Sequence, residues 1–412
     1  MKQLSICLLL GSLLLGVGVS FGLSAAKPVE KKTPITASHT NRSYPLGAVC
    51  DGLEPGSSLD QGMSRFSWWN HLGTKEWVQH TFDKPRRISS TSVYWYANRG
   101  IQTPKSWRLL YLAGKEWKEV PGASVYGTEI DRYNKVTFTP LETRALRIEA
   151  QLKPKLSAGI LEWKIESPAD EPMAPVDESV CEMGKKVGDH KLNYILHTPG
   201  GPKPCDGWPL MLFLHGYGEC GDDIKKVKKH GPPKLIEKIA ALRGCVIVSP
   251  QCPKNSWWRT EALKALVDEV IADRGDIDTK RLYVTGLSMG GYGTWSFISR
   301  YPDYFAAAVP ICGGGDPFAL PSNRPGKKKG IKNEFDPEGL KRAKDLLTWA
   351  FHGTKDRSVP IKETEMLVKI LKDAGSKKVK LTPYKDAGHV AAWQKAYNDP
   401  ELWKWLFAQK RP

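Results

Sequence analysis

The sequence lacks the cysteine patterns that bind metal or hold a small domain together. Its 412 residues contain eight cysteines, and no two of them form a C-x-x-C pair. Seven remain if Cys7 is removed with the N-terminal segment, so at least one is unpaired or bonded elsewhere. Neither a zinc site nor a disulfide scaffold is therefore indicated.

The basic runs of the chain lack interleaved aromatic residues. The formal net charge is +17, but the short runs at 225–229 and 326–332 contain none of the aromatic side chains on which single-stranded nucleic acid stacks. We interpret the charge as solvated surface and expect no nucleic-acid partner. Such a surface still favours an anionic polymer or cell envelope.

Residues 1–26 have the pattern of a secretory signal peptide. One lysine precedes a Leu- and Gly-rich apolar run, and small residues end the segment at Ala26. We expect a secreted or periplasmic protein with no membrane span after cleavage; an uncleaved membrane anchor is the alternative. The composition of the whole chain, with 41% hydrophobic and 25% charged residues, is typical of a soluble globular protein.

The length predicts two domains, and the sequence pattern changes between them. Residues 44–166 contain short β-favouring runs separated by turn residues, without long helical periods, which predicts an antiparallel β-sandwich. Residues 167–179 are rich in Pro, Ala and acidic residues and form the predicted linker. Residues 180–412 alternate apolar strands with amphipathic helices, which predicts an α/β domain whose mostly parallel sheet has helices on both faces.

The stretch "VTGLSMGGYGTW" contains a G-x-S-x-G motif centred on Ser288. It follows a predicted strand and precedes a predicted helix, where a sharp turn exposes the serine at the carboxyl edge of the sheet. Side chains at Gly286 or Gly290 would collide in such a turn. The spacing therefore predicts that Ser288 is a nucleophile.

A serine nucleophile needs a base and an orienting acid, and in an α/β fold with this strand-to-helix turn the chain order is Ser, then acid, then His. Asp356 and His389 stand in loops after two late strands. We interpret Asp386 as a turn residue and His215 as a residue that shapes its loop. The backbone N–H groups of Met289 and Tyr217 are the predicted oxyanion donors.

Several motifs in residues 181–412 resemble the α/β-hydrolase fold, in particular secreted bacterial carboxylesterases of the esterase D and feruloyl-esterase type. They are "HGYGE", "GLSMGGYGTW", "YPDYFAAAVPICGGGDP", "FHGTKDRSVP" and "AGH". The resemblance implies Ser288 as nucleophile, His389 as base and Asp356 as acid. It also implies carboxylic ester hydrolysis through an acyl-enzyme, with no metal or other cofactor for catalysis. In this fold Cys220 and Cys252 follow neighbouring strands, which leaves a disulfide between them open.

The first module is similar to the discoidin-like, or coagulation-factor type C, modules that accompany polysaccharide-degrading enzymes. The likeness rests on "DGLEP", "RFSWWNHLGTKEWVQHTFDKP", "SVYWYA", "PKSWRLLY" and "AGILEWKIE". It implies sugar binding by loops at one end of the sandwich. It also leaves open a structural calcium ion, whose ligands the resemblance does not assign residue by residue.

Aromatic residues outside the strand patterns are candidates for substrate contacts, because a flat ring with polar groups beside it can receive a sugar. For the sandwich the glycan-binding candidates are Trp68, Trp69, Asn98 and Arg99. For the α/β domain the candidates at the mouth of the site are Trp257, Trp258 and Trp393.

The combined prediction is a secreted serine carboxylesterase that removes acetyl or feruloyl groups from a polysaccharide held by its sandwich module. Two alternatives stay open. One is a serine peptidase of the prolyl-oligopeptidase type, which shares the fold and the triad. The other is a glycan-binding protein whose hydrolase domain is an inactive scaffold, against which the intact triad argues.

Overall fold

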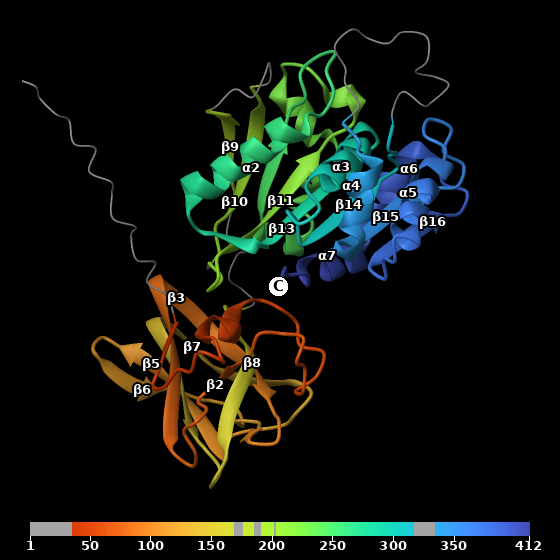
Figure 1. Ribbon diagram of the computed structural model, residues 1–412. Coiled ribbons are helices and arrows are strands. Elements are labelled where there is room, and N and C mark those ends of the chain that lie inside the picture. Colours follow the sequence, from red (N-terminus) through yellow and green to blue (C-terminus); the bar gives the residue numbers. More distant parts are fainter. Residues whose placement is uncertain (1–34, 169–175, 185–190, 202, 317–333) are drawn as a thin grey trace, which may run out of the picture. The chain divides into compact units, whose positions relative to one another are not determined.

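The computed structural model describes residues 35–168, 176–184, 191–201, 203–316 and 334–412, which form an all-β module followed by an α/β domain (Figure 1). The predicted signal peptide, residues 169–175 of the predicted linker and the basic run at 326–332 lie outside the described residues. Among the helices of the described part, none has the length and apolar character needed to cross a bilayer.

The first module consists of one eight-stranded sheet around an apolar core. Its strands are β1 (Ile35–Ala37), β2 (Phe66–Ser67), β3 (Lys75–Tyr96), β4 (Ile101–Gln102), β5 (Ser106–Ala113), β6 (Glu116–Glu119), β7 (Tyr133–Gln151) and β8 (Ser157–Glu166). They run in the order β2-β8-β3-β7-β5-β6, with β1 on β3 and β4 on β8, and pair antiparallel except for β4 with β8. The register of β3 on β7 shifts after Thr81 and after Ile88. Such bulges bend a strand and let one sheet wrap its core.

Two predicted boundaries need correction. β1 pairs with β3, with Ile35 opposite His80, so the module begins before residue 44. β9 (Val176–Glu182) begins inside the predicted linker at 167–179 and pairs over its whole length with β10 (Asn193–Pro199). In both cases the missed residues belong to edge strands, which a short stretch of sequence does not distinguish from a loop.

The cysteines of the described residues include one disulfide pair. A disulfide joins Cys50 to Cys205. Among the described residues, Cys220 and Cys252 form no disulfide, so the pairing that the sequence left open is not present.

The α/β domain has a second eight-stranded sheet, in the order β16-β15-β14-β13-β11-β12-β10-β9. Its remaining strands are β11 (Trp208–Leu214), β12 (Val246–Pro250), β13 (Ile277–Leu287), β14 (Ala307–Ile311), β15 (Leu347–Gly353) and β16 (Val379–Tyr384). Strand β10 pairs antiparallel with both of its neighbours, β9 and β12, and all the other pairs are parallel. The α/β-hydrolase arrangement predicted from the sequence is thereby confirmed, with its mostly parallel sheet.

Helices cover both faces of this sheet. The helices are α1 (Gly231–Leu235), α2 (Thr260–Arg274), α3 (Met289–Arg300), α4 (Pro337–Arg342), α5 (Lys362–Asp373), α6 (His389–Asn398) and α7 (Pro400–Phe407). Side chains of α2 to α5 pack in one core, and those of α1, α6 and α7 pack in the other. Because both faces are covered, all seven residues of β11 are buried. The chain leaves the sheet at the carboxyl ends of the parallel strands, where we look for the site.

Candidate active site

Ser288 lies at the turn between β13 and α3. Its backbone adopts φ +54° and ψ −117°, a conformation that non-glycine residues rarely take. A Cβ on Gly286 would lie 2.3 Å from the carbonyl oxygen of Gly290, and a Cβ on Gly290 would lie 1.9 Å from that of Leu214. Both glycines are therefore required by space, as the motif predicts.

The structure brings the three predicted triad residues into one hydrogen-bonded line. His389, the first residue of α6, places Nε2 2.8 Å from Ser288 Oγ and Nδ1 2.5 Å from Asp356 Oδ2. Asp356 lies in the loop between β15 and α5, and its side chain is fully buried, whereas that of His389 is 14% exposed. The arrangement connects a hydroxyl to a carboxylate through one imidazole ring, the geometry that activates a serine.

The surroundings of Asp356 keep it ionised. Its Oδ1 accepts hydrogen bonds from the backbone N–H groups of Ser358 and Val359, each at 2.9 Å. Burial raises the pKa of Asp356, but hydrogen bonds from His352, His389 and Val359 outweigh burial and hold this pKa well below its usual range. The carboxylate is thus an anion that can orient His389 and stabilise its protonated form.

The two rival residues have other partners. Asp386 is exposed, has φ +59° and forms an ion pair with Lys355 at 2.8 Å, which fits the predicted turn residue. His215 is buried, donates from Nδ1 to the carbonyl oxygen of Gly216 at 2.6 Å and accepts the Cys252 N–H at Nε2 at 2.9 Å. With both ring nitrogens bonded to backbone, His215 fixes its loop, as predicted.

Two backbone segments flank Ser288 where the predicted oxyanion donors lie. Met289 is the first residue of α3, where backbone N–H groups have no partner within the helix. Tyr217 begins the short 3-10 helix η2 (Tyr217–Glu219) after β11. A Cβ on the preceding Gly216 would lie 3.7 Å from Ser288 Cβ, so this loop passes beside the nucleophile.

Two residues next to the triad were not identified from the sequence. His352, the sixth residue of β15, is buried, with Nε2 2.8 Å from the Val359 carbonyl and 3.3 Å from Asp356 Oδ2. Cys312 follows β14, and its Sγ lies within 4.8 Å of ligand atoms of Asp356 and His389. Their only sequence signal was a polar residue at the end of a strand that leads to a catalytic loop.

The aromatic candidates of this domain divide by burial. Trp258 is 2% exposed and packs edge-on against His215, so its predicted position at the mouth of the site was wrong. Trp257 is half-buried and lies edge-on to Tyr292, with ring centroids 6.0 Å apart. Trp393 is 8% exposed and packs edge-on against the ring of His389, with centroids 5.1 Å apart.

The candidates in the first module divide in the same way. Trp68 is fully buried in the core, which rules out its predicted contact with a glycan. Trp69 is 37% exposed, and its ring lies so close to Gly100 that a Cβ there would approach it to 3.1 Å. The neighbouring Arg99 is exposed, and Asn98 donates to the Tyr96 hydroxyl at 3.1 Å. Trp69, Asn98 and Arg99 therefore lie in one region of the surface.

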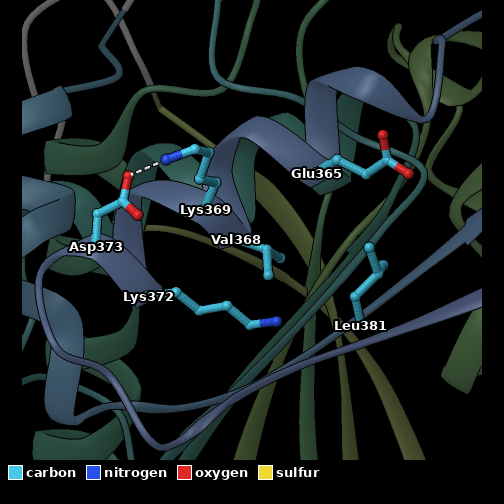
Figure 2. Close-up of a pocket in the computed structure, with 6 residues that line it drawn as sticks. All are labelled: Glu365, Val368, Lys369, Lys372, Asp373 and Leu381. Carbon is cyan, nitrogen blue, oxygen red and sulfur yellow. Dashed lines mark hydrogen bonds and ion pairs between the residues drawn. The ribbon is translucent and has the colours of Figure 1, made fainter.

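A pocket elsewhere in the α/β domain is separate from the triad. Its lining residues belong to α5 and β16, and an ion pair between Lys369 and Asp373 lies on it (Figure 2). None of the triad residues is among those that line it.

Comparison with protein families finds one match in each part of the chain. Residues 34–162 match the F5/8 type C domain, and residues 259–323, which include Ser288, match the prolyl oligopeptidase family. The discoidin-like first module and the α/β-hydrolase likeness predicted from the sequence are thus confirmed.

Known proteins resemble the chain over part of its length. A poly(3-hydroxyalkanoate) depolymerase C from Paucimonas lemoignei is 47% identical over 152 residues, which cover 33% of this chain and 34% of the depolymerase. A bifunctional acetylxylan esterase/xylanase from Neocallimastix patriciarum is 30% identical over 129 residues, 28% of this chain and 17% of that protein. The crystal structure of a thermostable esterase is 24% identical, with a TM-score of 0.44, and covers 80% of this chain and 98% of its own. The chain spans about a third of the length of the depolymerase that it matches.

Proposed function

We propose that this chain is a secreted serine carboxylesterase that removes acyl groups, acetyl or feruloyl, from a polysaccharide. The observation that carries the proposal is the hydrogen-bonded line from Asp356 through His389 to Ser288 at a strand-to-helix turn. The names of two relatives, a poly(3-hydroxyalkanoate) depolymerase and an acetylxylan esterase, support acyl chemistry on a polymer. The N-terminal signal pattern supports secretion.

In the proposed mechanism, His389 Nε2 takes the proton of the Ser288 hydroxyl as Oγ attacks the ester carbonyl carbon. The carbonyl π electrons move to oxygen, and the backbone N–H groups of Met289 and Tyr217 bind this oxyanion. Asp356 stabilises the imidazolium that forms. When the intermediate collapses, the C–O bond to the alcohol breaks and His389 returns the proton to the leaving oxygen.

In the second half of the proposed reaction, water hydrolyses the acyl-enzyme by the same steps. His389 accepts a proton from water as it attacks the acyl-enzyme carbonyl, and the same N–H groups hold the second oxyanion. Collapse breaks the bond to Ser288 Oγ, which regains its proton from His389, and the carboxylic acid leaves. Every proton passes through one imidazole nitrogen, the one 2.8 Å from Ser288 Oγ.

The test is hydrolysis of phenyl acetate, methyl ferulate and acetylated xylan by the mature protein and by Ser288→Ala. We expect kcat on each substrate that the wild type hydrolyses to fall by at least about 10⁴-fold in the variant. Equal activity of the two proteins would refute the nucleophile. A wild type inactive on all three esters would refute the esterase proposal.

A second candidate is a peptidase, which the match of residues 259–323 to the prolyl oligopeptidase family favours. The same triad cleaves amides, so substrates separate the two functions. Turnover of proline-containing peptide anilides with kcat/KM above that for phenyl acetate would establish the peptidase.

The first module is proposed to hold the enzyme at a glycan surface. Trp69 supplies an exposed ring, and Arg99 and Asn98 supply polar groups nearby. We expect Trp69→Ala to lower the fraction of protein that sediments with insoluble xylan while leaving phenyl acetate hydrolysis unchanged. Equal sedimentation of wild type and variant would contradict the assignment.

A structural calcium ion in this module is a further proposal. Asp51 and Glu162 are both buried, and Oδ2 of Asp51 has no hydrogen-bond partner among the described residues, although Lys410 Nζ forms an ion pair with it at 3.9 Å. Burial raises the pKa of Asp51 to about 6, although the charge of Lys410 lowers it. Burial, and then the nearby Asp51 carboxylate, also raise the pKa of Glu162. Two buried carboxylates close together suit an oxygen-ligated cation. We expect EDTA to lower the melting temperature of the wild type and to have less effect on Asp51→Asn.

A further inference from the structure

Two buried polar atoms close to the triad have no hydrogen-bond partner among the described residues. Within the part of the chain that the structure describes, neither the Tyr292 hydroxyl nor Glu363 Oε2 makes a hydrogen bond. Tyr292 is 2% exposed. A Cβ on Gly314 would lie 2.8 Å from Tyr292 Cε1 and 2.9 Å from Glu363 Oε2, so both side chains border the same glycine. Unpaired buried polar atoms are uncommon, and two at one place indicate a missing partner.

The chain order places this pair at the same edge of the sheet as the triad. Tyr292 lies in the first turn of α3 and donates its backbone N–H to the Ser288 carbonyl at 3.1 Å. Gly314 follows β14, and Glu363 lies in the first turn of α5, after the Asp356 loop. Strands β13, β14 and β15 are neighbours in the sheet (Figure 1), so their carboxyl ends bring these residues together.

Apolar side chains pack beside the two polar groups of Tyr292 and Glu363. Val359, from the Asp356 loop, packs against Tyr292, and Trp257 lies edge-on to the same ring at 6.0 Å. Burial and then the nearby Asp316 carboxylate raise the pKa of Glu363, and burial and then Glu363 raise that of Tyr292. A tyrosine hydroxyl can donate or accept a hydrogen bond and a carboxylate accepts. A ligand hydroxyl matches both groups, because it can donate to Glu363 and accept from Tyr292.

We propose that Tyr292 and Glu363 form a substrate subsite that binds a hydroxyl group of the ester, with Trp257 against the ring that carries this hydroxyl. The inference rests on the proposed esterase function and defines its substrate class. The hydroxyl can come from the sugar or from the phenol of a feruloyl group, and the test separates these two sources.

The test uses Tyr292→Phe and Glu363→Gln, which keep the size of each side chain. Phenyl acetate carries no hydroxyl, methyl ferulate carries a phenol, its O-methylated analogue does not, and an acetylated xylo-oligosaccharide carries sugar hydroxyls. We expect kcat/KM to fall about tenfold or more on the hydroxyl-bearing substrate, mainly through KM, and to stay within about twofold on phenyl acetate. A fall on methyl ferulate but not on its O-methylated analogue identifies the phenol, and a fall on the oligosaccharide identifies the sugar.

Glu365→Gln is the matched control. Glu365 is an exposed glutamate two residues further along α5, where it lines the separate pocket of α5 and β16 (Figure 2). We expect it to behave as wild type on every substrate. Equal losses on all substrates in Tyr292→Phe and Glu363→Gln would overturn the subsite and assign the pair to folding, and unchanged kinetics would also overturn it. A failure of the esterase proposal is seen separately, because Ser288→Ala would then match the wild type on phenyl acetate.

Discussion

Two loops at the carboxyl edge of the second sheet each carry a histidine, and they use it in opposite ways. After β11, His215 is buried and gives both ring nitrogens to backbone groups of Gly216 and Cys252. After β16, His389 is partly exposed and gives its ring nitrogens to the Asp356 carboxylate and the Ser288 hydroxyl. The residue type is the same, and the bonding partners differ.

The partners decide what each ring can do. A backbone carbonyl and a backbone N–H do not exchange protons with imidazole at neutral pH, and burial lowers the pKa of His215 to about 4. His215 is thus a neutral ring that holds the loop carrying Tyr217. A hydroxyl can give up its proton to imidazole when an anion stabilises the product, and His389 has both groups.

The largest expected effect distinguishes the two histidines directly. His389→Ala removes the base, and we expect kcat on phenyl acetate to fall by about 10⁴-fold or more. His215→Asn removes the contacts of the ring but leaves the catalytic base in place, and we expect kcat to fall far less. Steady-state kinetics of both variants measure this, and comparable losses would break the distinction.

The next effect concerns the acid that orients His389. Asp356→Asn keeps the shape of the side chain but removes the anion, and we expect kcat to fall by about 10⁴-fold. Asp386→Asn is the control, because Asp386 is exposed and paired with Lys355. If Asp386→Asn were the more damaging change, the acid would have to be reassigned.

A smaller effect on kcat is expected when the His215 loop loses the Tyr217 backbone N–H, the predicted oxyanion donor. Tyr217 is the first residue of η2, a position that tolerates proline, so Tyr217→Pro removes the backbone N–H with little disturbance. We expect kcat to fall about 10²- to 10³-fold. Tyr217→Ala keeps the N–H and should stay within about threefold. Equal kcat values for the two variants would exclude this N–H as an oxyanion donor.

The smallest effect is on stability and depends on pH. Unfolded histidine binds a proton below its ordinary pKa of 6.5, whereas buried His215 does so only near 4, so the unfolded state gains protons between these values. The free energy of unfolding should therefore fall as pH drops from 6.5 towards 4, by up to about 3 kcal/mol from this residue. Urea unfolding at about pH 7.5 and about pH 4.5 should show a weaker pH dependence in His215→Asn than in wild type. The same dependence in both proteins would contradict the buried neutral ring.

The sequence predicted the nucleophile turn well because its requirements are local. A side chain at Gly286 would collide with the Gly290 carbonyl, and one at Gly290 would collide with the carbonyl of Leu214 on the neighbouring strand β11. Asp356 and His389 were predictable because the strand order fixes which loops meet Ser288. The edge strands β1 and β9 were not, because their pairing depends on partners elsewhere in the chain.

The aromatic pairs show why burial was harder to predict. Trp68 and Trp69 are adjacent, yet the first is in the core and the second is 37% exposed. In the pair Trp257 and Trp258, the second is the buried one. Both pairs lie outside strands, where no period applies, and a Trp-Trp pair gives no signal of which ring faces the core. His352 was missed for a related reason, since a buried histidine inside a strand resembles a packing residue.

The most direct test of the central claim is to trap the acyl-enzyme. Wild-type protein quenched during turnover of phenyl acetate and digested for mass spectrometry should carry one acetyl group on Ser288. His389→Ala treated in the same way should carry none. An acetyl group on another residue, or equal labelling of Ser288 in the two proteins, would contradict the assignment of Ser288 as a nucleophile activated by His389.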